Sequence, residues 1–312
     1  MIITKSVLLL RVKIRVFTKK YQTMKSLFAL LLGVIICTVN INAQIIGNLA
    51  LPDLSTKAIP IDDVQFIAQY EMAFVQDTLN LQNITKETMI LKIGVKTSMF
   101  YSYTRFVSDS LVMVQMENNG GKIIRQQIGP GSTNTGQINY KIYKNYPDGK
   151  VTTLERFGPS RFLCEENNEK PEWQILSDTT VILNYLCNKA TCHFKGRDYV
   201  VWYTSEIPRS DGPWKLSGLP GFILKAEDVQ GHYSFECTGL FYGQSGEKIM
   251  FGADDYEPVS RRNLNRAYER FAADPIGFTT SSSPNIKIMI RDADGGAKTP
   301  KNIPFNPIEK SE

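Results

Sequence analysis

The sequence predicts a mainly β fold: a curved, largely antiparallel, half-barrel-like sheet with one main amphipathic helix. Glycine, proline and asparagine interrupt the chain at short intervals, and the segments between them are rich in β-branched and aromatic residues. This combination is typical of antiparallel sheets, in which short strands alternate with tight turns. A helical repeat of apolar residues is clear only in residues 258–273, which is why one helix is predicted.

The first 43 residues are expected to be a targeting segment. Met24-Lys25 is followed by an apolar run over residues 26–37, and Ala43 supplies a small residue before Gln44. A basic start, a short apolar run and a small residue at its end are the features of a secretory signal peptide. We therefore expect Met24 to be the true start, residues 1–23 to be an over-long start, and the chain from Gln44 onward to be exported and soluble.

The positive charge of the chain belongs to this leader. Residues 1–43 contain seven basic and no acidic residues, so their removal changes the formal net charge from +5 to −2. A chain close to neutrality has no electrostatic attraction for a polyanion. The composition therefore gives no reason to expect nucleic acid as a partner.

The predicted strands follow one another through the remaining chain, and their boundaries are set by turn residues. Asn118–Gly121 and Pro147–Gly149 offer residues that tolerate positive φ in hairpins. The strands are expected over residues 64–74, 88–93, 99–107, 111–117, 122–128, 137–143, 151–157, 173–176, 181–186, 190–195, 199–204, 222–228, 233–240 and 286–290.

The predicted helix covers residues 258–273 and is expected to lie on the sheet. Leu264, Ala267, Tyr268 and Phe271 recur at helical spacing, and Pro258 suits a first turn. No linker divides residues 44–312, so we expect one β-rich domain. Its end, residues 292–312, is expected to be an extended tail whose proline-containing part docks along the domain.

A loop rich in glycine and proline precedes the strand at residues 222–228. Leu219-Pro-Gly-Phe222 has the residues of a type II turn, in which proline presets φ and glycine supplies positive φ. Trp214 and the residues from Phe222 to Leu224 are expected to be held by this turn as a packed corner, and a ligand-contacting loop beside an exposed tryptophan is the alternative. The candidate structural turn residues are Gly212, Pro213, Gly218, Pro220 and Gly221, and the candidate ligand-binding residues are Trp202, Trp214, Leu219, Phe222 and Arg197.

Arg197 stands at the shoulder of a turn before an aromatic strand. We expect it to pair with Asp211, Glu206 or Asp228 and so to hold the Gly/Pro loop against the sheet.

Cys164, Cys187, Cys192 and Cys237 remain after the leader. An even count in an exported chain favours disulfides, with free buried thiols as the alternative. Metal binding by Cys187, Cys192 and His193 is a weaker interpretation, because residues five apart on a strand point to opposite faces.

The stretch Gly212-Pro-Trp-Lys-Leu-Ser-Gly-Leu-Pro-Gly-Phe-Ile-Leu224 resembles the signature of the GLPGLI family, exported Bacteroidetes proteins whose biochemical role is not established. Residues 91–102, 173–208 and 306–309 also resemble blocks of that family. Phe222 stands where the family has leucine, and Asn184 where a glycine is expected. The resemblance implies the compartment and the fold, and it brings no catalytic residues.

We expect a non-enzymatic binding or accessory protein of the periplasm or outer membrane, with an apolar groove for a lipid or a peptide. An outer-membrane TonB-dependent receptor or a secretion component is the expected kind of protein partner, and no cofactor is expected. Two alternatives stay open: a periplasmic copper or zinc handling protein that uses Cys and Met ligands, and a hydrolase of unrecognised type. No Gly-x-Ser-x-Gly motif accompanies the two histidines.

Overall fold

The computed structural model describes residues 57–118, 138–282 and 303–310. The chain divides into units of residues 1–43 and 44–312, and every described residue lies in the second. The turn predicted at residues 118–121 and the strands predicted at 122–128 and 286–290 fall wholly or largely outside the described residues. In the part of the chain that is described, no helix has the length and apolar character needed to cross a membrane.

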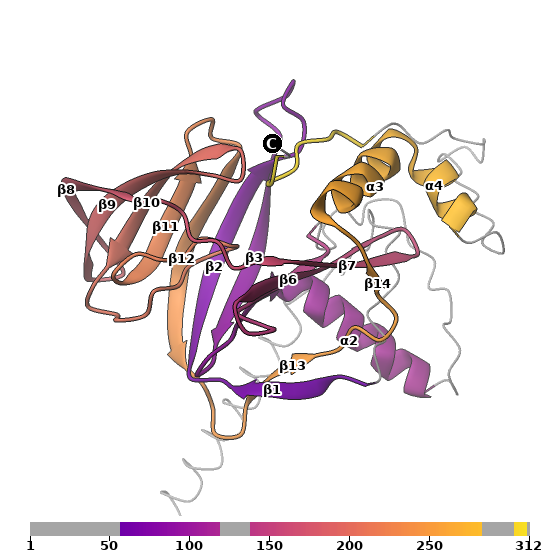
Figure 1. Cartoon of the computed structure of the whole chain (residues 1–312), viewed down its shortest axis with the longest axis horizontal. Helices are drawn as coiled ribbons and strands as arrows, with labels where there is room; N and C mark the ends of the chain where they lie inside the picture. The colour runs from indigo at the N-terminus through magenta and orange to yellow at the C-terminus, as the bar shows by residue number, and fades with distance from the viewer. Residues whose placement is uncertain (1–56, 119–137, 283–302, 311–312) are drawn as a thin grey trace, which may run out of the picture. The chain divides into compact units, whose positions relative to one another are not determined.

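The prediction of a mainly β fold with a large antiparallel sheet is confirmed (Figure 1). Among the described residues, twelve strands form one open sheet in the order β14-β7-β6-β5-β4-β3-β2-β12-β11-β10-β9-β8, and β1 pairs with β13 separately. Of these described strands, only β14 pairs in parallel, with β7. The strands are β1 (Ile59–Asp63), β2 (Phe66–Val75), β3 (Ile84–Ile93), β4 (Ser98–Ser102), β5 (Tyr140–Lys144), β6 (Lys150–Phe157), β7 (Ser160–Asn167), β8 (Gln174–Ile182), β9 (Tyr185–Phe194), β10 (Arg197–Thr204), β11 (Phe222–Asp228), β12 (Tyr233–Tyr242), β13 (Lys248–Phe251) and β14 (Glu257–Pro258).

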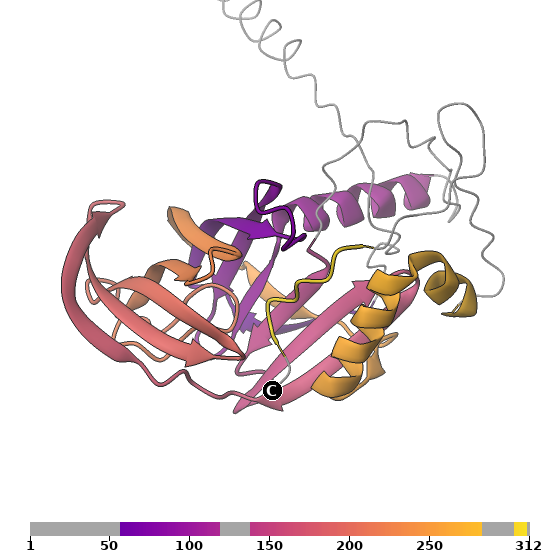
Figure 2. The ribbon, with the colours of Figure 1, turned by 90° about the horizontal axis from the view of Figure 1, so that it is seen from above.

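One face of the sheet, here called the inner face, carries the largest core. Alternate residues of β2 from Phe66 to Phe74 are buried there, while Gln69 and Glu71 between them are less buried. The sheet bends strongly through β8–β12 (Figure 2). The loop of residues 205–221 fills the inner face, because Ile207, Trp214 and Leu216 belong to the same core.

In the part of the chain that the structure describes, three helices accompany the sheet where one was predicted. Helix α2 (Tyr103–Asn118) replaces the strand predicted at 111–117 and the second half of the one predicted at 99–107. Ser102 ends β4 and its hydroxyl accepts a hydrogen bond from the Arg105 amide at 3.0 Å, which is the geometry of a helix N-cap. Asp109 of α2 pairs with Arg156 of β6, which alternates with the inner-face residues. Helix α2 therefore lies on the opposite face.

Helix α3 (Arg261–Ala273) confirms the predicted amphipathic helix, and α4 (Pro275–Ser282) follows it. Ser260 caps α3 by accepting a hydrogen bond from the Asn263 amide. Leu264 and Phe271 of α3 pack with Phe157 of β6 and Phe162 of β7. In Figure 2 the C-terminal segment, residues 303–310, runs between α3 and the bent β8–β12 part of the sheet.

The segment predicted as a strand at residues 181–186 instead contains a hairpin turn. Ile182 pairs with Tyr185, and Leu183 and Asn184 between them have φ of +49° and +66°. Two consecutive positive φ values define a type I′ turn, which suits the twist of a hairpin. The turn predicted at Pro147–Gly149 is present, with Gly149 at φ +74°.

Candidate binding site

Arg197 begins β10 directly after the two-residue turn Lys195-Gly196. Both turn residues have positive φ, +51° and +76°, as a type I′ hairpin requires. The Arg197 guanidinium pairs with the Asp228 carboxylate at 2.5 Å, and both side chains are 1% exposed. Of the three acidic residues expected as its partner, the structure selects Asp228, the last residue of β11.

The remaining donors of Arg197 bind the C-terminal segment. Its Nε donates to the Ile308 carbonyl at 2.8 Å. Its Nη2 donates to the Pro307 carbonyl at 2.6 Å and to the Asn306 side-chain oxygen at 2.8 Å. The expectation that Arg197 holds the Gly/Pro loop is therefore wrong, because these contacts go to the other end of the chain. The guanidinium group of Arg197 is planar and its N–H groups point in fixed directions, so it suits acceptors that are held in place.

Asn306 fixes the position of the segment on the inner face. Its Nδ2 donates to the Val75 carbonyl at the end of β2 at 2.6 Å. The Tyr233 hydroxyl donates to the Asn306 carbonyl at 2.5 Å, and the Arg197 guanidinium lies 4.7 Å from the Tyr233 ring centroid. Asn306 is buried, so these bonds satisfy polar groups that water does not reach.

Glu309 anchors the segment electrostatically. Lys215 Nζ lies 2.6 Å from a carboxylate oxygen of Glu309 and 2.6 Å from one of Glu166. Arg261 of α3 lies 2.6 Å from Glu166 and 3.5 Å from Glu309. Burial raises the pKa of Glu166, but Lys215 and Arg261 outweigh it and bring that pKa to about 2. The Glu166 carboxylate therefore stays ionised at neutral pH.

The predicted Gly/Pro loop is mostly core. Trp214 is 1% exposed, which agrees with the packed corner expected there and not with the alternative of an exposed tryptophan. Its ring packs edge-on against Phe194 at 5.9 Å and tilted against Tyr199 at 6.0 Å. Leu219 and Phe222 are also fully buried in this core. The bend of the sheet brings β9 and β10 over the loop, which local sequence does not reveal.

The turn at residues 219–222 is tighter than the predicted type II turn. The Gly221 amide donates to the Leu219 carbonyl at 2.8 Å, so the turn closes over three residues rather than four. Gly221 has φ +153°, and a Cβ there would lie 2.2 Å from the Thr204 carbonyl oxygen. Glycine is required here by both backbone conformation and close contact.

The other candidate turn residues and Trp202 have different environments. A Cβ at Gly212 would lie 2.8 Å from Ile223 Cβ, Pro213 accepts a hydrogen bond from the Leu216 amide, and Gly218 has φ +102°. Trp202 is partly buried, with Lys189 Nζ 5.7 Å from its ring. The structure does not bring Trp202 to the C-terminal segment.

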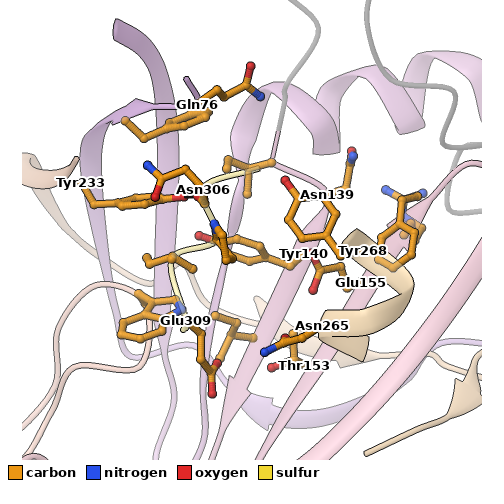
Figure 3. A pocket seen from close by; sticks show the side chains of 18 of the residues that line it. Gln76, Asn139, Tyr140, Thr153, Glu155, Tyr233, Asn265, Tyr268, Asn306 and Glu309 are labelled. Carbon is orange, nitrogen blue, oxygen red and sulfur yellow. Dashed lines mark hydrogen bonds between the residues drawn. The ribbon is translucent and has the colours of Figure 1, made fainter. Parts of the chain in front are cut away.

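A cavity of about 100 Å³ lies beside the C-terminal segment (Figure 3). The sheet contributes one wall, α3 a second and the C-terminal segment a third. Trp214 is the one predicted ligand-binding residue that lines it. Its other lining residues include Asn139, Tyr140, Thr153, Glu155, Tyr233, Asn265, Tyr268 and Asn306.

Glu155 and Asn139 are two of the polar lining residues that were not predicted from the sequence. Glu155 lies two residues from Thr153 and two from Phe157 on β6, so it shares the inner face with them and lines the cavity. Burial raises its pKa. The Asn139 side-chain oxygen is buried without a hydrogen-bond partner. The sequence does contain one signal for Glu155: in the predicted strand 151–157 it is the charged residue on the face that Val151 and Phe157 share.

The disulfide prediction is wrong: Cys164, Cys187, Cys192 and Cys237 are free and buried. Strands are about 4.8 Å apart, so β12 with Cys237 lies roughly 14 Å from β9, and a disulfide needs Cα atoms within about 7 Å. Cys164 belongs to a different core cluster. Within the described ranges no group of three or more His, Cys, Asp or Glu side chains could hold a metal.

A family model described as "Protein of unknown function (Porph_ging)" matches residues 195–225. This family is associated with Bacteroidetes and has no assigned function. The matched residues run from the β9–β10 turn through the Gly/Pro loop into β11, and they include Arg197, Lys215 and Gly221.

No curated protein matches the chain. Two solved structures titled "Structure of PNGF-II" are similar in part. In the P21 form the identity is 15% and the TM-score 0.43, with 65% of this chain and 32% of that chain covered. In the C2 form the identity is 16% and the TM-score 0.40, with 64% and 31% covered. The match thus covers about a third of the length of each of those two chains.

Proposed function

We propose that this chain is an exported binding or accessory protein of GLPGLI type that recognises an extended peptide segment on the inner face of its sheet. Export rests on the signal-peptide pattern before Gln44, and the family on the signature at residues 212–224. On the inner face, the chain's own C-terminal segment, residues 303–310, makes the contacts that support this proposal.

The observation that carries this proposal is the set of Arg197 contacts. A buried, ion-paired guanidinium donates three hydrogen bonds to two backbone carbonyls and one side chain of the segment. Charge-assisted bonds of this kind bind strongly and also fix register. Proteins that bind extended peptides selectively combine hydrogen bonds to the peptide backbone with recognition of particular side chains. Here the recognised side chain is that of Asn306.

The same contacts favour a peptide over a lipid. The cavity beside the segment is about 100 Å³, smaller than the roughly 150 Å³ that holds one benzene. Its wall also contains Glu155, Asn139 and Asn265. An acyl chain needs a longer apolar channel. The position of a partner's peptide is occupied here by residues 303–310, so binding in trans requires the segment to leave.

A protease site introduced between residues 290 and 300 tests this proposal in the full exported chain. After cleavage, the C-terminal fragment is expected to stay bound through gel filtration. An excess of a synthetic peptide of residues 303–312 should displace it, and a scrambled peptide should not. Arg197→Lys should accelerate its loss, while Arg270→Lys, at an exposed position on α3, should not. Immediate release of the wild-type fragment would refute peptide recognition.

If the proposal holds, we expect the partner to be a peptide of an outer-membrane receptor or secretion component. Competition between such a peptide and the cleaved C-terminal fragment would identify it. In the described residues nothing favours the metal-handling alternative, since Cys164, Cys187, Cys192 and Cys237 are dispersed and buried.

A further inference from the structure

Two polar side chains of the C-terminal segment are buried, and they lie three positions apart (Figure 3). Asn306 is 7% exposed and Glu309 is 6% exposed, whereas Pro304 and Phe305 before them are exposed. Burying a polar side chain is costly unless its polar atoms have partners. The partners of these two side chains therefore decide which residues the site accepts.

The Asn306 amide is held on its two sides by groups of opposite kind. Its oxygen accepts from Arg197 Nη2 at 2.8 Å, and its Nδ2 donates to the Val75 carbonyl at 2.6 Å. A guanidinium can only donate and a carbonyl can only accept, so the amide oxygen and nitrogen cannot exchange places. The site requires an acceptor and a donor on one short planar group, which asparagine supplies.

An aspartate in place of Asn306 would lose one of these bonds. One carboxylate oxygen could accept from Arg197, but the other would face the Val75 carbonyl, and two acceptors repel each other. The charge of Arg197 gives little compensation, because the Asp228 carboxylate already pairs with it and both side chains are 1% exposed. A buried carboxylate without a cation of its own is costly. The geometry therefore favours asparagine over aspartate.

Glu309 lies among cations, so its position has the opposite requirement. Lys215 Nζ lies 2.6 Å from one of its carboxylate oxygens, and Arg261 Nε lies 3.5 Å from the other. Both cations also pair with Glu166, which would be their one shared carboxylate among the described residues if Glu309 were absent. The Lys215 side chain is 4% exposed, so water cannot replace the lost partner. A glutamine here would leave buried positive charge unbalanced.

The two positions between Asn306 and Glu309 are recognised less specifically. Arg197 binds the backbone carbonyls of Pro307 and Ile308, and every residue has such a carbonyl. The Ile308 side chain is partly buried and packs against the largest core, so an apolar residue suits that position. The contacts together describe a four-residue pattern of asparagine, any residue, an apolar residue and glutamate.

We propose that the inner face selects partner peptides by this pattern, Asn-x-apolar-Glu, and discriminates against aspartate at the first position and glutamine at the last. This inference rests on the peptide recognition proposed above and specifies which peptides the site accepts: extended segments with a neutral amide and a carboxylate three residues apart. A peptide that is merely acidic would satisfy Lys215 and Arg261 but not the Val75 carbonyl.

Competition among peptides tests this selectivity. The full exported chain, cut between residues 290 and 300 and still holding its C-terminal fragment, is incubated to equilibrium with synthetic 303–312 peptides, and gel filtration measures the released fragment. The Asn306→Asp and Glu309→Gln peptides should each need at least about tenfold more peptide than wild type for equal release, since each leaves a buried partner unpaired. The Glu312→Gln peptide, with the same net charge as Glu309→Gln, should compete as wild type does.

A substitution in the protein separates recognition of Glu309 from a property of the peptide itself. In an Arg261→Gln chain, the difference between the wild-type and Glu309→Gln peptides should shrink, because one of the two cations is gone. Arg270→Gln, at an exposed position on α3, should preserve the difference. Circular dichroism and thermal unfolding confirm that each chain is folded. The peptide series itself uses one unaltered binding face, so it does not depend on these variants.

The possible results distinguish selectivity from recognition. If either the Asn306→Asp or the Glu309→Gln peptide releases the fragment as readily as the wild-type peptide, selectivity is overturned while peptide recognition stands. Equal weakness of the Glu309→Gln and Glu312→Gln peptides would also overturn selectivity, because net charge alone would then explain binding. Failure of the wild-type peptide to release a retained fragment would overturn both proposals.

Discussion

Arg197 and Asp228 form an ion pair in which both side chains are 1% exposed, and the same guanidinium holds three acceptors of the C-terminal segment. Asp228 also accepts from the His232 amide at 2.7 Å. The pair therefore joins β10, β11 and the hairpin that follows to the end of the chain. Removing either partner leaves an uncompensated buried charge.

Arg197→Ala is expected to lower the free energy of unfolding by about 3–5 kcal/mol, the cost of leaving a buried partner unpaired. Urea unfolding monitored by circular dichroism measures it. Arg270→Ala, at an exposed position, should stay within about 0.5 kcal/mol of wild type. Equal stability of the Arg197→Ala and wild-type chains would contradict the structural role given to this pair.

Gly221→Ala is expected to destabilise the fold by more than about 3 kcal/mol, because its φ of +153° and the Thr204 carbonyl both exclude a Cβ. Gly231 is the matched control. It has φ +68° with nothing within 4 Å of an added Cβ, so Gly231→Ala should cost only the conformational term, about 1–2 kcal/mol. Similar losses in thermal stability for the two variants would argue against the close contact at Thr204.

Glu155→Gln is expected to stabilise the chain at neutral pH. Burial raises the folded-state pKa of Glu155, with Arg261 opposing and Glu309 reinforcing the shift. The wild-type chain therefore loses stability as pH rises from the unfolded pKa through the folded one, and the glutamine variant does not. The advantage of the variant should be near zero at about pH 4 and positive at about pH 8.

Urea unfolding at both values tests this pH dependence, with exposed Glu165→Gln as control. A variant less stable than wild type at the higher pH would show that the carboxylate has a partner in the folded chain.

Thiol titration of the exported chain is expected to find four free thiols after denaturation and slow reaction in the native state. Burial raises the pKa of Cys192 and of Cys237 to about 12, so little reactive thiolate forms at neutral pH. Two thiols or none in the denatured chain, without reductant, would restore the disulfide interpretation.

Several strands could be predicted because alternation and turn residues are local properties. The strands at 151–157, 199–204 and 222–228 match β6, β10 and β11 closely. Helix α2 was missed because its first residues, Tyr103-Thr-Arg-Phe-Val107, are aromatic and β-branched and favour strands. Its capping by Ser102 and its pairing with Arg156 override that preference.

The binding site was less accessible to sequence reasoning, because long-range contacts form it. Asp228 was among the predicted partners of Arg197, but the Asn306 contact joins residues 109 positions apart. The glycine and proline residues around Trp214 predict a packed corner, but they do not reveal that the bend of the sheet brings β9 and β10 over it. The disulfide prediction rested on the even number of cysteines. It failed because the order of the strands in the sheet keeps the cysteines apart, and their number does not reveal that order.

Coupling between Arg197 and Asn306 in peptide binding tests whether the inner face recognises the C-terminal segment. The cleaved chain, freed of its C-terminal fragment, is titrated with the 303–312 peptide and with the same peptide carrying Asn306→Ala, in wild-type and Arg197→Lys backgrounds. We expect non-additive losses of binding free energy, with Asn306→Ala costing less in the lysine background, because Arg197 and Asn306 are in direct contact. Strictly additive losses, or a peptide that does not bind the wild-type chain, would contradict this recognition.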